Sequence, residues 1–121
     1  MRTIQWLVAA VFTANGLMML VVPELWYHIM PGVIDTGPFN AHFVRDIGIA
    51  YLVSGAAFGW LLRDFDRAWP AAVGAAIFQL LHGGLHIVEV LLGTQSVTHL
   101  LVDAPAVLVL PALALWSIST H

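Results

Sequence analysis

Residues 70–92 read PAAVGAAIFQLLHGGLHIVEVLL, and this stretch decides the class of fold. A helix needs about 20 mostly apolar residues to cross the hydrocarbon core of a bilayer, and this stretch is long enough. It also carries Gln79, His82, His86 and Glu89, which fall on nearly the same face of a helix. An apolar helix with one polar face predicts a membrane span that turns this face toward other helices.

Three more apolar stretches are about as long as residues 70–92. They cover residues 4–23, 42–62 and 98–117. The last three stretches are joined by a charged turn at 63–67 and by the short connection 93–96. Short connections between successive spans make neighbouring helices antiparallel. We therefore predict an all-α integral membrane protein, an up-down-up-down four-helix bundle that forms a single domain over residues 1–121.

The composition supports the bilayer as the solvent of this chain. Of the 121 residues, 60% are hydrophobic and only 9% are charged. The chain has 0 Cys, so any metal site needs nitrogen and oxygen ligands. The net charge of -3 and the absence of a basic run argue against a nucleic-acid partner, which leaves the lipid bilayer, a larger membrane complex or a homo-oligomer.

Residues 24–41 are predicted to form one long interfacial loop between the first two helices. The loop contains four helix-breaking residues, namely Pro31, Gly32, Gly37 and Pro38. It also contains an aromatic-rich apolar patch, formed by Leu25, Trp26, Tyr27, Ile29 and Met30. Such a patch is typical of a segment at the headgroup level, where it can act as a lid.

The orientation in the membrane follows from the positions of the arginines. Arg2, Arg63 and Arg67 lie at one end of the predicted bundle, and only Arg45 lies toward the other. Basic residues are more frequent in cytoplasmic loops, so both termini are predicted to be cytoplasmic. Pro105 and Pro111 interrupt the fourth helix and are predicted to kink it.

Three of the predicted helices each carry two ionisable residues four positions apart, a spacing that puts both on one helix face. The pairs are His42 and Asp46, His82 and His86, and His99 and Asp103. The antiparallel topology places all three pairs in the half of the bilayer away from the cytoplasm. Because a charged side chain costs about 2.5 to 3.5 kcal/mol at the centre of a membrane helix, the pairs should face one another inside the bundle.

Neutral imidazoles and carboxylates on facing helices are ligands for Cu, Fe or Zn. The best candidate metal ligands are His82, His86, Asp46 and Asp103. His42, His99 and Glu89 are candidates for further ligands or for partners that orient an imidazole. A metal ion would also balance the acidic residues of this group, which face Arg45 as the one cationic side chain nearby.

The leading hypothesis is a metal-binding membrane protein whose site lies beneath the interfacial loop. Iron or copper would favour an oxidoreductase, and zinc a hydrolase, acting on a membrane-soluble substrate while Glu89 or Asp46 moves protons. The alternative is a non-enzymatic accessory subunit of a larger membrane complex, whose His, Asp and Arg groups form a structural network. Haem ligation by His82 or His86 and transport along the polar stripe are weaker alternatives.

The size, the four-helix layout and the run Gly16-Leu17-Met18-Met19-Leu20 resemble the small bacterial DoxX-like membrane proteins. The resemblance covers most of the chain as a hydropathy pattern and implies a four-helix protein of the bacterial inner membrane. The His and Asp pairs are not part of it. The thiosulfate:quinone oxidoreductase chemistry related to that group therefore does not carry over.

Overall fold

The computed structural model describes residues 1–119, and this part of the chain is helical, with no strand. The predicted all-α class is confirmed. In chain order, the elements are α1 (Arg2–Val21), α2 (Pro23–Ile29), the 3₁₀ helix η1 (Val33–Thr36), α3 (Ala41–Leu61), α4 (Phe65–Leu91), α5 (Val97–Ala104), the π-helical segment η2 (Pro105–Val109) and α6 (Leu110–Ser119).

Two predicted boundaries differ from the structure. The loop predicted at residues 24–41 contains α2 and η1, and α2 begins with Pro23, whose fixed φ suits the first position of a helix. The third helix begins at Phe65 rather than at residue 70. The carboxylate of Asp64 caps it by accepting a hydrogen bond from the Arg67 N–H, so half of the charged turn is helical.

The interruption predicted at Pro105 takes the form of the π-helical segment η2. Pro105 has no N–H to donate to the preceding turn, and its own carbonyl accepts from the N–H of Leu110, five residues on. The carbonyl of Val107 in η2 lies against Gly83 of α4, where an added Cβ would meet it. This contact brings the backbones of α4 and η2 together just beyond Asp103.

Three helices are long and apolar enough to cross a membrane. They are α1, α4 and the continuous helical run Val97–Ser119. Helix α3 has a similar length but is not among them. Its first two turns carry His42, Arg45 and Asp46, which lower its hydropathy.

Helices α1 and α3 form one closely packed pair. A Cβ added to Gly16 of α1 would lie 2.6 Å from the carbonyl oxygen of Gly48 in α3, so only glycine allows this approach. An arginine side chain closes the end of each partner: Arg2 donates to Leu62 O, and Arg45 donates to Leu20 O. These carbonyls carry the negative end of the helix dipole, which a guanidinium stabilises.

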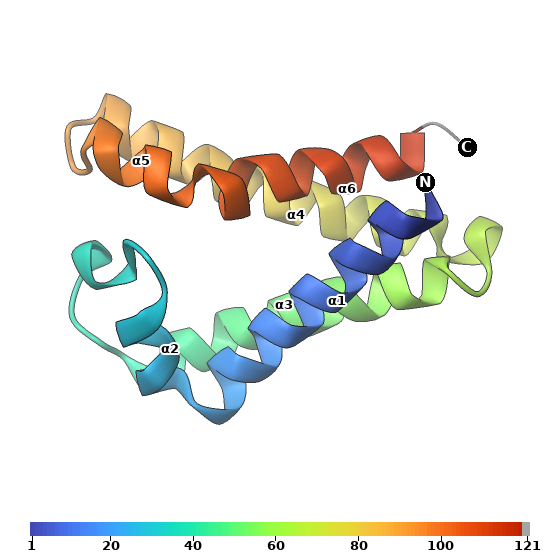
Figure 1. Ribbon diagram of the computed structural model, residues 1–121, viewed down its shortest axis with the longest axis horizontal. Coiled ribbons are helices and arrows are strands. Elements are labelled where there is room, and N and C mark those ends of the chain that lie inside the picture. The colour runs from blue at the N-terminus through green and yellow to red at the C-terminus, as the bar shows by residue number, and fades with distance from the viewer. Residues whose placement is uncertain (120–121) are drawn as a thin grey trace.

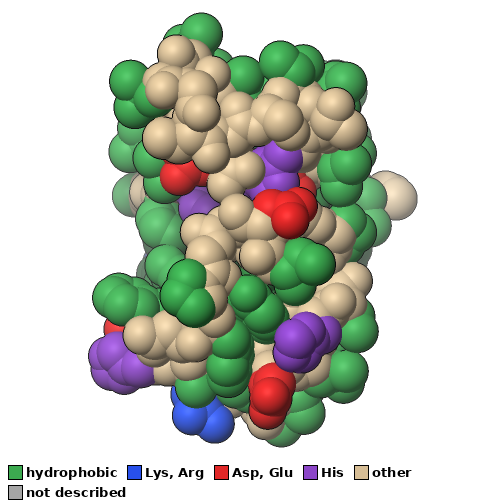
Figure 2. Space-filling model, turned by 90° about the vertical axis from the view of Figure 1, so that its left-hand side faces the viewer, with side chains coloured by type: hydrophobic (Ala, Val, Ile, Leu, Met, Phe, Trp, Pro, Cys, Tyr) green, Lys and Arg blue, Asp and Glu red, His purple; other side chains and the backbone are tan. Residues whose placement is uncertain are grey.

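Helices α4 and α6 form the opposite side, and the two sides pack together from the end with the termini to about the middle of α3 and α4, where Gln79 donates to Ser54. At the end with the termini α1 contacts α6, and Gln5 donates a buried hydrogen bond of 2.9 Å to Ser117 O. At the other end α1 and α5 are apart and not in contact, and α2 and η1 lie near this opening (Figure 1). Figure 2 looks onto this end and shows His, Asp and Glu side chains at its surface.

Candidate metal centre

The site begins with the sharp turn between α4 and α5. Gly93 has a φ of 75°, a conformation that favours glycine, and the N–H groups of Thr94 and Gln95 donate to the carbonyl of Glu89. The hydroxyl of Ser96 then caps α5 by accepting from the His99 N–H at 3.0 Å. This turn folds α5 back along α4 and places its first turns beside the end of α4.

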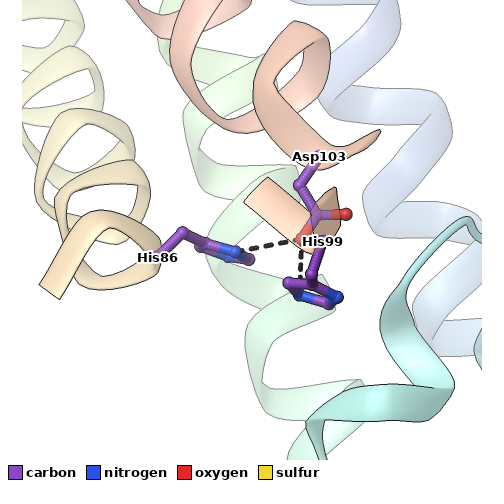
Figure 3. A group of neighbouring side chains, drawn as sticks. All are labelled: His86, His99 and Asp103. Carbon is purple, nitrogen blue, oxygen red and sulfur yellow. Dashed lines mark ion pairs between the residues drawn. The ribbon is translucent and has the colours of Figure 1, made fainter. Parts of the chain in front are cut away.

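His99 and Asp103 lie one turn apart on the inner face of α5. Both side chains are buried, with exposed fractions of 5% and 9%, and His99 Nε2 lies 2.8 Å from Asp103 Oδ2. His86 of α4 approaches the same carboxylate oxygen, with its Nδ1 at 3.1 Å and its side chain 14% exposed. The Asp103 carboxylate therefore lies between imidazoles from two helices (Figure 3).

The imidazole nitrogens of this cluster are buried without hydrogen bonds. His86 Nδ1 and both ring nitrogens of His99 make no hydrogen bond of acceptable geometry with any residue that the structure describes. A buried polar atom left without a partner costs about 1–3 kcal/mol. Two of the three, His86 Nδ1 and His99 Nε2, lie at ion-pair distance from Asp103 Oδ2, and a metal ion bound by one nitrogen of each ring together with this carboxylate would satisfy them.

The spacing of the donors also fits an ion. One ligand atom from each of His86, His99 and Asp103 can be chosen so that all three lie within 4.8 Å of one another. Ligands at about 2.1 Å from a tetrahedral metal are separated by roughly 3.4 Å. The observed separations of 2.8 and 3.1 Å are close to this value, so small side-chain rotations would admit an ion.

The loop segment before α3 contributes two residues that sequence reasoning missed. Asp35 Oδ2 lies 3.8 Å from His99 Nδ1, and the backbone carbonyl of Asp35 accepts from Gln95 Nε2 at 3.1 Å. Gly32 has a φ of 79°, and a Cβ there would lie 2.7 Å from Asp103 Oδ1. The sequence held one signal for Asp35: it is an acidic residue in the long loop at the end of the molecule where the three predicted pairs lie.

His82 and Glu89, both predicted ligands, lie close to the cluster. The ring of His82 is 5.1 Å from that of His86, centroid to centroid, and is half-buried. Glu89 lines a cavity of about 840 Å³ together with His82, His86 and Asp103. His82 and Glu89 therefore lie beside the group formed by His86, His99 and Asp103 and do not belong to it.

His42 and Asp46 lie outside the cluster. They pair with each other at 3.2 Å near the start of α3, and their side chains are 81% and 52% exposed. Their helix face turns away from the interior, and among the described residues neither lies in the His and acidic cluster that contains His86. Asp46, predicted both as a ligand and as a proton carrier, is not among the residues that line the cavity.

Two other polar residues of the interior have structural partners. Gln79, on the polar stripe of α4, is almost fully buried and donates to the hydroxyl of Ser54 on α3 at 3.4 Å. Asn15 of α1 accepts from the indole N–H of Trp26 at 2.8 Å, which ties α2 to α1. These contacts join the helices around the cavity.

Comparison with known proteins yields no relative: no family model, curated protein or solved structure matches the chain. The chemistry is therefore inferred from the donor set. Two imidazoles and one carboxylate leave coordination positions open for water or substrate. This composition is found in catalytic zinc sites and in non-haem iron(II) sites.

Proposed function

We propose that the chain is an integral membrane protein of four antiparallel helices that binds one divalent transition metal through His86, His99 and Asp103. The observation that carries this proposal is the burial of these three donors within 4.8 Å of one another, with imidazole nitrogens that have no hydrogen bond among the described residues. The spans would be α1, α3, α4 and the run Val97–Ser119.

The membrane placement rests on length, composition and connectivity. Three of these spans are apolar enough by themselves. Helix α3 packs along α1 and is joined to α4 by a short turn, so it must cross with them. Its charged first turns would then lie at the interface rather than in the hydrocarbon. Arg2, Arg63 and Arg67 at the opposite end favour cytoplasmic termini. A bacterial inner membrane is what the resemblance to the DoxX-like proteins implies.

The charges of the site favour a divalent cation. Asp103 and the nearby Asp35 bring two carboxylates to His99, and no arginine or lysine forms an ion pair with either among the described residues. A divalent ion bound by neutral imidazoles would balance both charges. It would also remove the cost of leaving a carboxylate without a counter-charge in a low-dielectric interior.

The open coordination positions favour chemistry at the metal. Iron or copper there would support an oxidoreductase, and zinc would support a hydrolase by lowering the pKa of bound water. Of the two predicted proton carriers, Glu89 suits this role, because it faces the cavity that His86 and Asp103 also line. The identity of the bound metal would separate the two reaction classes.

The test is elemental analysis by mass spectrometry of protein purified in detergent without chelators. We expect about one transition metal ion per chain in the wild type and none above background in the H86A/H99A double variant. The matched control is the H28A/H42A double variant, which removes two exposed imidazoles. It should keep the full metal content of the wild type.

Two results would count against the proposal. If the wild type holds no metal, even after reconstitution with iron, copper and zinc, the cluster is a structural network and the accessory-subunit alternative gains support. If H28A/H42A loses as much metal as H86A/H99A, the ion is bound elsewhere. Fractionation of the cells, with the chain in the soluble fraction, would reject the membrane placement independently.

A further inference from the structure

The cavity between the two sides of the molecule is large enough for a lipid-sized ligand. Its volume of about 840 Å³ falls within the range of small-molecule sites in proteins. Most of its lining is apolar. The lining residues come from all of the helices, at positions away from the end of the molecule that holds the termini. Representative residues are Val11 and Met18 of α1, Ile47 of α3, Leu85 of α4 and Val102 of α5.

The cavity lies between α1 and the α5–η2 segment. These two segments are not in contact, although each contributes to the cavity lining. Ala14 on α1 and Ala106 on η2 both line the cavity and are both exposed. In the proposed membrane placement, Ala14 and Ala106 lie in the hydrocarbon region, so a ligand can enter from the bilayer.

The polar groups on the wall restrict the head of such a ligand. No lysine or arginine lines the cavity, whereas Glu89 and Asp103 do. Without a bound metal, an anionic head, such as a phosphate or an ionised carboxylate, would therefore meet like charges and no cationic side chain. The lining thus disfavours phospholipids and fatty acids and favours a neutral head.

Two further groups can hold a neutral head. The hydroxyl of Tyr51 and the imidazole of His82 both line the cavity, and their rings are 6.3 Å apart. Neither group makes a hydrogen bond with another residue in the described part of the chain. Both can donate a hydrogen bond to a hydroxyl or carbonyl oxygen.

We infer that the cavity binds a neutral lipophilic molecule, with a hydrocarbon body and a hydroxyl or carbonyl head, which enters between α1 and η2. The head lies near Tyr51 and His82, beside the metal candidate. This inference names the substrate class of the proposed site and rests on the proposed membrane placement. Binding itself does not require the metal.

The experiment uses photocrosslinking in nanodiscs of zwitterionic phosphatidylcholine. The probe is a sixteen-carbon alcohol with a diazirine in its chain, compared with the corresponding carboxylic acid at pH 8.5, and both are used on protein stripped of metal with EDTA. Crosslinked residues are mapped by tandem mass spectrometry. We expect the alcohol to label cavity-lining residues of α1 and η2, and excess unlabelled hexadecanol to reduce this labelling at least fivefold. The acid should label the same residues at least fivefold less.

Two variants fill the cavity from opposite walls, A14W and A106W. Each should reduce the competed labelling at least fivefold, whereas A10W, at an exposed alanine outside the lining, should not. The inference is overturned if the alcohol labels outer faces evenly without competition, if the acid labels as well as the alcohol, or if both cavity variants label like the wild type. Metal content is measured on the same preparations before the EDTA treatment. Competed labelling of a preparation that held no metal would reject the metal proposal alone, and stoichiometric metal without competed labelling would reject this inference alone.

Discussion

The two His–Asp pairs of α3 and α5 have the same local sequence pattern and very different surroundings. In each pair the histidine precedes the aspartate by four residues and follows closely on a polar N-cap, Asn40 in α3 and Ser96 in α5. The pair distances are similar, 3.2 Å in α3 and 2.8 Å in α5. The α3 side chains are mostly exposed, whereas those of α5 are buried.

The difference comes from the neighbours of each pair. The α5 pair meets His86 from α4, and the loop around Gly32 and Asp35 covers it. Among the described residues, no third ionisable group joins the α3 pair. A spacing of four therefore creates a pair, but a second helix and a covering loop are needed to turn it into a metal candidate. The predictions below test whether burial and the third donor make this difference.

The largest effect is expected from D103N, which keeps the size of the side chain and removes its charge. Asp103 Oδ2 is the atom closest to both imidazoles, so its loss should weaken metal binding by about 100-fold or more. The measurement is a competition titration with a chelating dye, using Zn²⁺ and Co²⁺. The matched variant D46N should stay within about twofold of the wild type, because exposed pairs contribute little. Equal losses in the two variants would remove the distinction between the pairs.

A smaller effect is expected from G83A, which tests how α4 is held against η2. The new methyl group would meet the carbonyl of Val107, and overpacking of this kind costs about 1–3 kcal/mol. Because His86 lies one turn further along α4, the displacement should also weaken metal binding. Thermal unfolding in detergent and the same titration measure both effects. The neighbouring G84A, where nothing lies within 4 Å of the new atom, should leave both unchanged.

Much of the fold was predictable because long apolar stretches and short connections are local properties of the sequence. The helical class, the interruption at Pro105 and the short turn after residue 92 all follow from them. The start of α4 was placed too late, because the charged residues around Asp64 were interpreted as a loop, although an aspartate there can cap a helix. Local signals therefore predicted the elements better than their ends.

The site was only partly predictable, for a reason that the two pairs show. His86, His99 and Asp103 were among the predicted ligands, and the structure brings them together. His42 and Asp46 were predicted with them, but helical periodicity does not tell which face turns inward. Asp35 was missed because its contact with His99 joins residues that are far apart in the chain, which no spacing rule detects.

G32A tests whether the loop contributes to the difference between the pairs. Alanine at a φ of 79° costs about 1–2 kcal/mol, and its Cβ would also press on Asp103 and His99. We expect roughly tenfold weaker metal binding, measured by the dye competition. The control is G37A, which also has a positive φ, of 141°, but has nothing within 4 Å of the new atom. If G37A loses as much metal affinity as G32A, backbone strain alone, rather than contact with the site, is responsible for the loss.

The smallest effect is expected from D35N, which addresses the second carboxylate near His99. A carboxylate that accepts from the free nitrogen of a metal-bound imidazole orients the ring and increases its basicity, and removing it typically costs 10- to 100-fold in affinity. Asp35 is 66% exposed and 3.8 Å from His99 Nδ1, so solvent screening should limit the loss to about tenfold or less. Because that screening weakens with salt removal, the loss should grow when the titration is repeated at low ionic strength. A loss as large as that of D103N would instead make Asp35 a direct ligand, and the site would then have donors from α4, from α5 and from the loop that covers them.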